Sequence, residues 1–490
     1  MPQALIIGAG IAGIAAAIRL AVKGYDVEVF EANNYPGGKL TEINQNGYRF
    51  DAGPSLLTMP QYIDELFELA GKNPKDYFQY HKLDTICKYF YEDGTRLTAW
   101  ADREKFIAEL SGKTIEPPEN VARCIDNSAT IYKATHKVFL ESSLHQPKTF
   151  FSKEGMKALF RLSQIDSKRS MHSANEGFFK NKKLVQFFDR YATYNGSDPY
   201  RAPATLNVIP HLEQHFGAYF PDGGTYAIVQ SLVKLAEELG IKFHYSLPVE
   251  EIILNSKKAT GIKVDGNVIE GDIVISNSDV WFTYKKLLAT RPDLHPKRML
   301  SQERSSSALI FYWGIKKQLP QLDLHNIFFS KDYKDEFESI WQKKNIYSDP
   351  TVYLNISSKY KPDDAPEDCE NWFVMINAPA NTGQNWDQLI AEAKQNILKK
   401  LSGILREDIE PLIECESILD PRSIETKTSS YQGSIYGASS NNRFAAFLRH
   451  ANKSSQVKNL YFCGGSVHPG GGIPLCLLSA KIVSGMVPKF

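Results

Sequence analysis

The first 31 residues contain the feature that most constrains the fold of this chain. A short apolar run at residues 4–7 predicts a strand that is buried on both faces. Three glycines follow at the spacing Gly-x-Gly-x-x-Gly: Gly8, Gly10 and Gly13. We expect a small-residue helix over residues 14–23 and a second strand over residues 26–30, directly before Glu31. This order of strand, glycine turn, helix, strand and acid predicts a Rossmann-like unit that binds a dinucleotide.

Each part of the unit has a physical role in holding a nucleotide. Gly8 permits the tight turn, Gly10 lets the backbone approach a pyrophosphate, and Gly13 allows close packing of helix on strand. The helix amino terminus offers amide hydrogens and a partial positive charge to the same pyrophosphate, and Ala12, shortly before it, is a further expected cofactor contact. Glu31 can accept hydrogen bonds from a ribose diol. The glycines alone could form an ordinary turn, but the flanking strands and Glu31 favour a nucleotide site.

A glycine pair and a cation come soon after this unit. Gly37 and Gly38 precede Lys39, and residues 50–55 are Phe-Asp-Ala-Gly-Pro-Ser. Here the sequence resembles the amine-oxidase-like FAD proteins, in which such a pair and a cation lie along the FAD phosphates. The resemblance implies FAD as the cofactor and adds Gly38, Lys39 and Ser55 to its expected contacts. Most relatives have arginine after the pair, so Lys39 keeps the charge and lacks the planar two-pronged donor. The alternative for the glycine pair is an ordinary loop.

The carboxyl-terminal region carries a second glycine motif. Residues 459–466 predict a last buried strand that enters a glycine turn, and residues 468–474 are His-Pro-Gly-Gly-Gly-Ile-Pro. A helix is expected over residues 475–483. The resemblance implies that its amino terminus points at the flavin pyrimidine ring, where the helix dipole stabilises charge on the reduced flavin. The residues expected to contact the cofactor here are Gly465, Ser466, Gly472, Ile473 and Pro474.

The middle of the chain completes the expected cofactor domain. Short strands are predicted over residues 249–254, 259–264 and 272–276. The resemblance implies that the backbone of Val249 lies against adenine and that Asn277 lies near the cofactor, although packing alone is an equally good role for Val249. We therefore predict an α/β fold, with a Rossmann-like FAD domain of the amine-oxidase or glutathione-reductase-2 type interleaved with an α+β substrate domain. The FAD domain would take residues 1–75, 212–285 and 415–490, and the substrate and membrane-facing domain residues 76–211 and 286–414.

Composition excludes several classes of protein. Lysine plus arginine number 57 and aspartate plus glutamate 56, which argues against a nucleic-acid binder. The six cysteines have neither metal-binding nor disulfide-framework spacing, so we expect buried thiols, a reducing compartment and no metal. The most apolar stretch, residues 4–22, is interrupted by glycines and Arg19 and is not expected to span a membrane. We expect a cytoplasmic protein that lies peripherally on the inner face of the membrane.

Residues 146–190 have the composition of a surface that contacts lipid. This window contains ten basic and four acidic side chains. Seven phenylalanines are interleaved with them: Phe150, Phe151, Phe160, Phe178, Phe179, Phe187 and Phe188. Basic charge beside exposed aromatic rings favours contact with an anionic bilayer. The alternative is a solvated basic face whose phenylalanines turn inward.

Three blocks together resemble the bacterial phytoene-desaturase family of carotenoid dehydrogenases over nearly the whole chain. They are residues 50–55, 219–224 and 459–474. Within that family the chain looks most like the 1-hydroxycarotenoid 3,4-desaturases, which act on acyclic or monocyclic hydroxylated carotenoids. The resemblance implies two-electron oxidation of a C–C bond by hydride transfer to flavin, which oxygen or a quinone then reoxidises. Because the flavin is the reactive group, we predict no catalytic acid or base; His468 could be a base, but a histidine before proline in such a turn is more often structural.

Three other functions are compatible with the same fold. A phytoene desaturase would oxidise a different carotenoid. A flavin amine oxidase would place paired aromatic side chains around an amine. A carrier resembling the GDP-dissociation inhibitors would hold a lipidated partner without FAD, but Glu31 and the carboxyl-terminal glycines argue against it.

Overall fold

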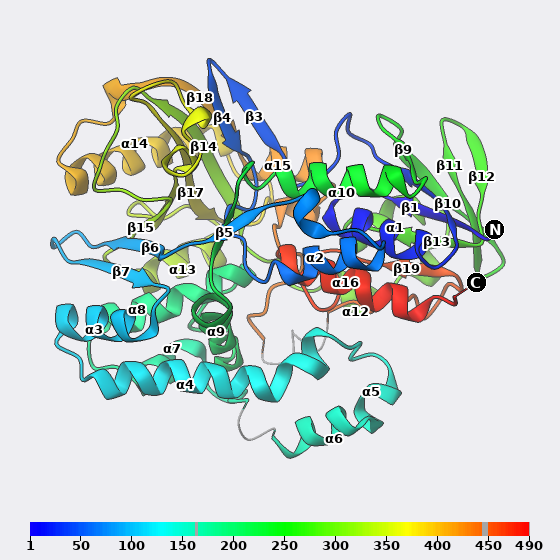
Figure 1. Ribbon diagram of the computed structural model, residues 1–490, viewed down its shortest axis with the longest axis horizontal. Helices are drawn as coiled ribbons and strands as arrows, with labels where there is room; N and C mark the ends of the chain where they lie inside the picture. Colours follow the sequence, from blue (N-terminus) through cyan, green and yellow to red (C-terminus); the bar gives the residue numbers. More distant parts are fainter. Residues whose placement is uncertain (162–164, 443–448, 490) are drawn as a thin grey trace.

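The computed structural model describes residues 1–161, 165–442 and 449–489. Figure 1 shows two halves side by side, each built around its own sheet, and the two chain termini close together at one edge of the molecule. Within the described ranges, no helix has the length and apolarity needed to cross a membrane. The six cysteines are free, and Cys369 and Cys476 are only partly buried, in contrast to the expectation for all six.

A five-stranded parallel sheet forms the core of the first half. Its strand order is β19–β13–β1–β2–β9. The strands are β1 (Gln3–Ile7), β2 (Asp26–Phe30), β9 (Lys242–His244), β13 (Ile273–Ser276) and β19 (Leu460–Phe462). Central strand β1 is buried at residues 4–7, as a continuous apolar run in a covered parallel sheet should be. The strands predicted on both sides of the glycine turn are confirmed, and we retain the predicted domain boundaries as a proposal.

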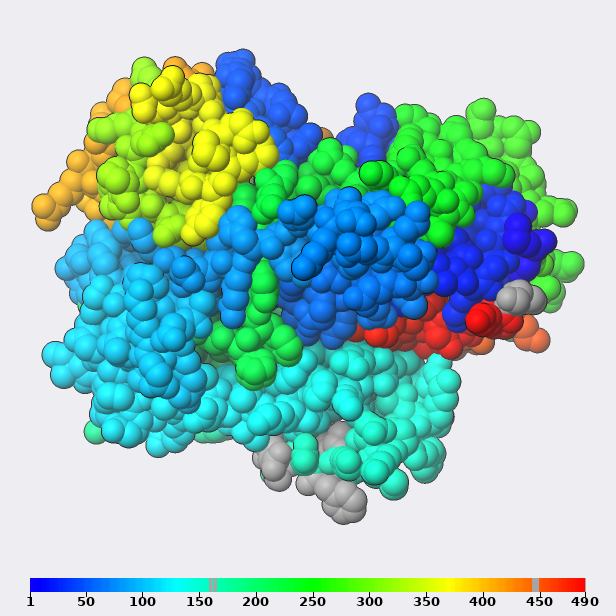
Figure 2. Space-filling view, in the orientation of Figure 1, coloured from blue at the N-terminus to red at the C-terminus, as the bar shows by residue number. Residues whose placement is uncertain are grey.

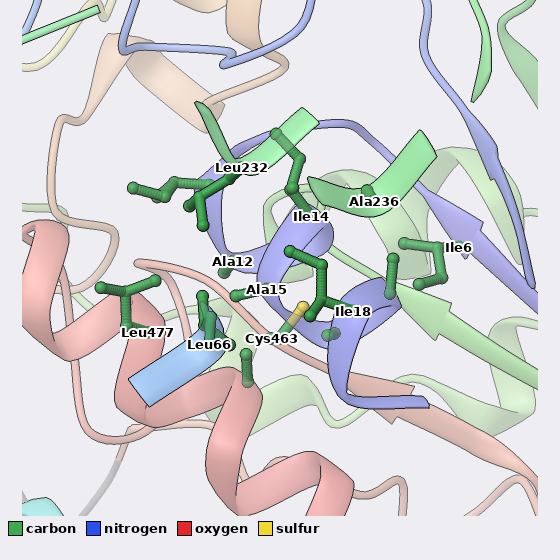
Figure 3. Close-up of a cluster of buried hydrophobic side chains, with 14 of the residues drawn as sticks. Ile6, Ala12, Ile14, Ala15, Ile18, Leu66, Leu232, Ala236, Cys463 and Leu477 are labelled. Atoms are coloured by element: carbon green, nitrogen blue, oxygen red, sulfur yellow. The ribbon is translucent and has the colours of Figure 1, made fainter. Parts of the chain in front are cut away.

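Four helices bury their apolar sides together on one face of this sheet. They are α1 (Ile11–Ala21), α2 (Gln61–Leu69), α10 (Ala227–Glu238) and α16 (Ile473–Met486). Figure 3 shows Ile14 and Ile18 of α1 among side chains from the other three helices. Helix α1 begins at Ile11 rather than Ile14, because extended Gly10 ends the turn and Gly13 already lies in the first helical turn. Helix α16 likewise begins at Ile473, two residues before its predicted start.

The opposite face of the parallel sheet is covered by a small antiparallel sheet in the order β10–β11–β12. Its strands are β10 (Val249–Asn255), β11 (Lys258–Val264) and β12 (Asn267–Glu270). Two further antiparallel sheets have two strands each. One is the hairpin of β3 (Glu42–Gln45) with β4 (Tyr48–Asp51), and the other pairs β5 (Tyr80–Lys82) with β8 (Tyr219–Pro221), which is distant in the sequence. The first of these rises between the two halves in Figure 1.

A seven-stranded sheet forms the second half, in the order β18–β14–β17–β16–β15–β6–β7. Its strands are β6 (Thr85–Phe90), β7 (Arg96–Trp100), β14 (Ser307–Ile315), β15 (His325–Phe328), β16 (Val352–Asn355), β17 (Glu370–Ala378) and β18 (Ile413–Leu419). One face packs on α14 (Trp386–Leu405) through apolar side chains that include Phe311, Trp313 and Val374. Because side chains alternate along a strand, the residues between these face the other way, toward the first half.

The remaining helices lie below the second sheet and around the junction of the two halves. They are α3 (Arg103–Thr114), α4 (Pro118–Thr135), α5 (Pro147–Phe151), α6 (Lys153–Phe160), α7 (Met171–Glu176), α8 (Lys182–Asp189), α9 (Ile209–His211), α11 (Val280–Phe282), α12 (Lys297–Leu300), α13 (Tyr333–Trp341) and α15 (Pro421–Thr428). In Figure 2 the turquoise segment that contains α5 and α6 forms the lower edge of the molecule.

The phenylalanines of residues 146–190 do not form one exposed surface. Phe179, Phe187 and Phe188 are buried in the core beneath β6 and β7, so the expectation that they face lipid is wrong. Helix α8, which carries Phe187 and Phe188, is amphipathic and turns Lys182 outward and these two rings inward. Phe151, at the end of α5, is 82% exposed. The side chain of Phe160 lies outside the described residues.

Candidate functional site

A cavity of about 950 Å³ lies between the parallel sheet and the seven-stranded sheet. Fourteen of the fifteen residues predicted to bind the cofactor line it. They are Gly8, Gly10, Ala12, Glu31, Gly38, Lys39, Ser55, Val249, Asn277, Gly465, Ser466, Gly472, Ile473 and Pro474. The fifteenth, Gly13, lies behind the glycine turn. The fold thus brings the two terminal glycine motifs to one cavity, where direct contact of each residue with a cofactor remains a proposal.

The glycine turn after β1 has no room for side chains. A Cβ at Gly13 would lie 2.2 Å from the carbonyl oxygen of Gly8, and a Cβ at Gly10 would lie 2.5 Å from Nδ2 of Asn277. Gly8 itself has a φ of +95°, which favours glycine. The bare backbone therefore lines the cavity at the amino end of α1, which leaves its first amide groups open to an anion.

Glu31 holds this turn in place. Its buried carboxylate accepts a hydrogen bond from the backbone N–H of Ala9 (2.7 Å) through Oε2. Oε1 accepts from the backbone N–H and the side-chain amide of Asn33, at 2.9 and 2.8 Å. Hydrogen bonds to a charged acceptor are among the stronger ones in proteins. The carboxylate is thereby fixed at the edge of the cavity, where a ribose contact was predicted.

Lys39 places a positive charge in the wall of the cavity. The preceding glycine pair lies against the turn, since the N–H of Gly37 donates to the carbonyl oxygen of Ala9 (2.8 Å). Lys39 Nζ donates to the carbonyl oxygens of Ile435 (3.2 Å) and Ser434 (3.4 Å) and makes no ion pair with any described residue. Burial lowers the pKa of Lys39 to about 8. An ammonium whose hydrogen bonds go to carbonyl groups and that makes no ion pair with a described residue is well suited to a bound phosphate.

The amino terminus of α16 faces the same cavity from the other side. Gly472 precedes the helix with a φ of +100°, and a Cβ there would meet no atom within 4 Å. Ile473 and Pro474 are the first two residues of the helix, so their peptide groups lie at the positive end of its dipole. Arg449 Nη1 donates to the carbonyl oxygens of Tyr436 (2.9 Å) and Gly465 (3.2 Å), which fixes the glycine turn ahead of the helix.

The seven-stranded sheet supplies a largely apolar wall opposite the glycine turns. Ala308, Ile310 and Tyr312 of β14 line the cavity at alternate positions, as do Phe373 and Met375 of β17. The hydroxyl of Tyr312 donates to the carbonyl oxygen of Ala52 (2.7 Å), so it presents no unpaired polar atom to the cavity. This wall can bind an extended hydrocarbon.

The sequence did not identify the polar residues at the far end of the cavity. Arg190, Glu213, His325 and Tyr353 line it, and none belongs to a recognisable motif. Ser55, predicted as a cofactor contact, hydrogen-bonds through Oγ with the hydroxyl of Tyr353 (2.6 Å). A buried ion pair of Asp279 with Arg304, near Lys39, was also missed. Within the described ranges, no group of three or more His, Cys, Asp or Glu side chains is arranged to hold a metal ion.

Comparison with known proteins agrees with this geometry. The family model for flavin-containing amine oxidoreductases matches residues 11–487. A 1-hydroxycarotenoid 3,4-desaturase from Flavobacterium sp. (strain P99-3) is 51% identical over 490 residues, covering 100% of this chain and 99% of the relative. A 4,4'-diapolycopene oxygenase from Methylomonas sp. is 34% identical, covering 98% and 97%. A phytoene desaturase from Phycomyces blakesleeanus is 32% identical, covering 99% and 84%.

Solved structures share the fold at low sequence identity. An oxidoreductase from Methanosarcina mazei has a TM-score of 0.67 at 16% identity, covering 98% of this chain and 99% of its own. A putrescine oxidase double mutant has a TM-score of 0.64 at 16% identity, covering 99% and 98%. The bare glycine turn, the unpaired Lys39 and the α16 amino terminus fit FAD, the cofactor that this family carries. The chain therefore belongs to the flavin-containing amine oxidoreductase family, alongside the carotenoid desaturases named above, and is an FAD-dependent oxidoreductase.

Proposed function

We propose that this protein is a 1-hydroxycarotenoid 3,4-desaturase, which introduces a C–C double bond into an acyclic or monocyclic hydroxylated carotenoid. The observation that carries the proposal is the cavity itself. On one side it is lined by the two glycine motifs with the amino ends of α1 and α16, which we call the cradle, and on the other by the apolar face of the seven-stranded sheet. The 51% identity to the Flavobacterium desaturase over the full chain supports the choice of substrate and of the bond oxidised. The broader carotenoid-desaturase assignment has further support from the phytoene desaturase relative.

The fifteen predicted residues would divide the binding of FAD among them. Gly8, Gly10, Ala12 and the amino end of α1 would face the pyrophosphate, with Gly13 packing behind them. Glu31 would accept from the ribose, and Lys39 with Gly38 would contact the phosphates. Val249 would lie against adenine. The contacts near the flavin ring would come from Ser55, Asn277, Gly465, Ser466, Gly472, Ile473 and Pro474.

The protein's own contribution to the reaction would be alignment and exclusion of water. Bound FAD would supply the hydride acceptor for the two-electron oxidation, and the neighbouring carbon would lose a proton as the double bond forms. The side chains of Ile310, Phe373 and Met375 would hold the polyene against the cradle, so that the reacting carbons are placed before the step begins. The conjugated chain itself spreads incipient positive charge, so we assign no catalytic acid or base. Reoxidation would use oxygen or a quinone.

We also propose that the protein takes its substrate from the surface of an anionic membrane. A C40 polyene dissolves in lipid, and α5 with α6 exposes Phe151 (82%) and Met156 (50%). Lys148, Lys153 and Lys157 are exposed beside them, a combination that favours anionic headgroups. Flotation with anionic liposomes at low salt should be lost in Phe151→Asp. The comparison is a triple variant, Lys180→Glu with Lys182→Glu and Lys183→Glu. If this variant loses flotation and Phe151→Asp keeps it, the membrane contact lies at residues 180–183 and not at α5 and α6.

Product analysis in cells that accumulate different carotenoid precursors tests the function. Only 1-hydroxylated precursors should gain the double bond, with absorption moving to longer wavelength. A Gly10→Val variant, whose side chain would fill the space beside Asn277, serves as a control that cannot bind flavin. Turnover of phytoene would point to a phytoene desaturase, and peroxide release from common amines to an amine oxidase. A protein that stays colourless with excess FAD would point to a lipid carrier.

A further inference from the structure

The cavity changes character along its length. Over β14 and β17 its wall is mostly apolar, whereas beside β15 and β16 it ends in polar side chains. Arg190, Glu213 and His325 line this end and have only 3%, 1% and 3% of their surface exposed. Any buried polar atom here without a protein partner would stay unpaired beside a pure hydrocarbon, which is unfavourable. A ligand that reaches this end should therefore carry a polar atom.

Arg190 and Glu213 form a buried pair at this end. Arg190, in the 3-10 helix η4 (Arg190–Asn195), donates through Nη2 to Glu213 Oε1 (3.2 Å), in the π-helix η6 (Leu212–Phe216). The hydroxyl of Tyr194 accepts from Arg190 Nη1 (3.0 Å) and donates to Glu213 Oε2 (2.9 Å). The pair is thus held by its own hydrogen bonds. Of the three nitrogens of the Arg190 guanidinium, only Nε has no hydrogen-bond partner among the described residues.

His325 presents a hydrogen-bond donor next to this pair. Its Nδ1 lies 3.2 Å from Nδ2 of Asn355, which can only donate, so Nδ1 is the accepting nitrogen. Burial, with the nearby charge of Arg190, lowers the pKa of His325 to about 3, so the ring is neutral and its proton sits on Nε2. Nε2 is buried and has no partner among the described residues. The ring therefore keeps one N–H free for a ligand.

A chain of hydrogen bonds connects this donor to the cofactor cradle. Tyr353 lies between the two, with its hydroxyl 2.8 Å from Nδ1 of His325 and 2.6 Å from Oγ of Ser55. Ser55 belongs to a segment, residues 52–56, that lines the same cavity as the glycine turns. The polar end is therefore linked by two hydrogen bonds to Ser55, a proposed flavin contact. In a 1-hydroxylated chain that is oxidised at its 3,4-bond, C1 and C3 are only two bonds of about 1.5 Å apart.

We propose that His325 recognises the substrate's hydroxyl group. Its Nε2 donates a hydrogen bond to the hydroxyl oxygen, at the polar end that His325 forms with Arg190 and Glu213. This inference rests on the proposed function and assigns its selectivity to one side chain. The hydroxylated end group fills the polar end and thereby sets the 3,4-bond at the cradle. A carotenoid that lacks the hydroxyl leaves the buried donor unpaired, and sites of this kind reject such analogues by up to roughly 10⁴-fold.

Equilibrium binding to the FAD-loaded protein tests the proposal. The probes are a 1-hydroxylated carotenoid and the carotenoid of the same polyene length without the hydroxyl, and the readouts are the carotenoid absorption shift and quenching of tryptophan fluorescence. In His325→Phe the preference for the hydroxylated probe should fall at least about tenfold. That probe loses its hydrogen bond, and the probe without the hydroxyl no longer leaves a buried donor unpaired. His325→Gln, whose amide can place a donor near the position of Nε2, should restore most of the preference. His81→Phe, at an exposed histidine that does not line the cavity, is the matched control and should leave the preference unchanged.

Two results would overturn the proposal. One is an unchanged preference in His325→Phe; the other is an equal loss of binding for both probes, which would make His325 a packing residue. The bound FAD of each variant, measured by its absorption, verifies that the variant is folded. Oxidation of the hydroxylated probe by the wild type keeps the proposed function intact in either case. A wild type that oxidises only the hydrocarbon probe would instead refute the proposed function and this inference with it.

Discussion

Replacing Lys39 by methionine should stabilise the FAD-free protein and weaken its binding of FAD. Burial lowers the pKa of Lys39 from 10.5 to about 8, so at pH 7 the folded chain holds a charge in a site that disfavours it. At about 1.4 kcal/mol per pKa unit, the difference between these two values corresponds to about 3 kcal/mol of lost stability. Because the pKa is lower in the folded state, the free energy of unfolding of the wild type should rise between about pH 8 and 10.5. The variant should lack this rise.

Thermal unfolding of the FAD-free protein and titration with FAD measure both effects. With about 2.1 cal/mol/K of unfolding entropy per residue, 490 residues give about 1 kcal/mol per degree, so the midpoint should rise by about 3 °C at pH 7. The lost contact with phosphate should weaken FAD binding about 10- to 150-fold, from about 1.5–3 kcal/mol for a hydrogen bond to a charged group. Lys286→Met, at an exposed lysine outside the cavity, is the matched control and should change neither value. An unchanged midpoint together with unchanged FAD affinity would refute the role given to Lys39.

Two further substitutions test the packing around the cradle. Gly13→Ala would place a Cβ 2.2 Å from the carbonyl oxygen of Gly8, so urea unfolding should show a loss of about 1–3 kcal/mol and the purified protein should carry less FAD; full FAD content would contradict this. Asp51 accepts from the backbone N–H groups of Thr225 (2.8 Å) and Tyr226 (3.0 Å) just before α10. Asp51→Ala should therefore lower the free energy of unfolding by roughly 1–2 kcal/mol and speed hydrogen exchange at the start of α10, and equal exchange in both proteins would count against the capping role.

The sequence predicted those parts of the site whose residues lie close together in the chain and form a recognisable motif. Strand β1, the turn at Gly8 and the acid Glu31 follow one another within a single βαβ unit, so their spacing alone specifies the fold. The helix starts were displaced by two or three residues because a glycine in a first turn, as at Gly13, gives no boundary signal. The surface assigned to residues 146–190 was partly wrong, because basic and aromatic residues share amphipathic helix α8 and face opposite ways.

The polar end of the cavity could not be predicted from the sequence. Arg190 and Glu213 are 23 residues apart in short helices without a motif, and His325 lies on strand β15 of the seven-stranded sheet. Only the folded arrangement of these segments brings the side chains to one cavity. These side chains indicate a ligand site only because they are buried, since the same residues at the surface would be ordinary solvated groups.

Anaerobic mixing of the FAD-loaded protein with one equivalent of a 1-hydroxylated carotenoid tests the central claim most directly. The claim is that one cavity holds the flavin cofactor and the polyene in direct contact. The account predicts that absorption near ~450 nm, which belongs to oxidised flavin, falls as one double bond per protein appears at the 3,4-position. A carotenoid that binds, with its own absorption shifted, while the flavin stays oxidised and no double bond forms would contradict the account.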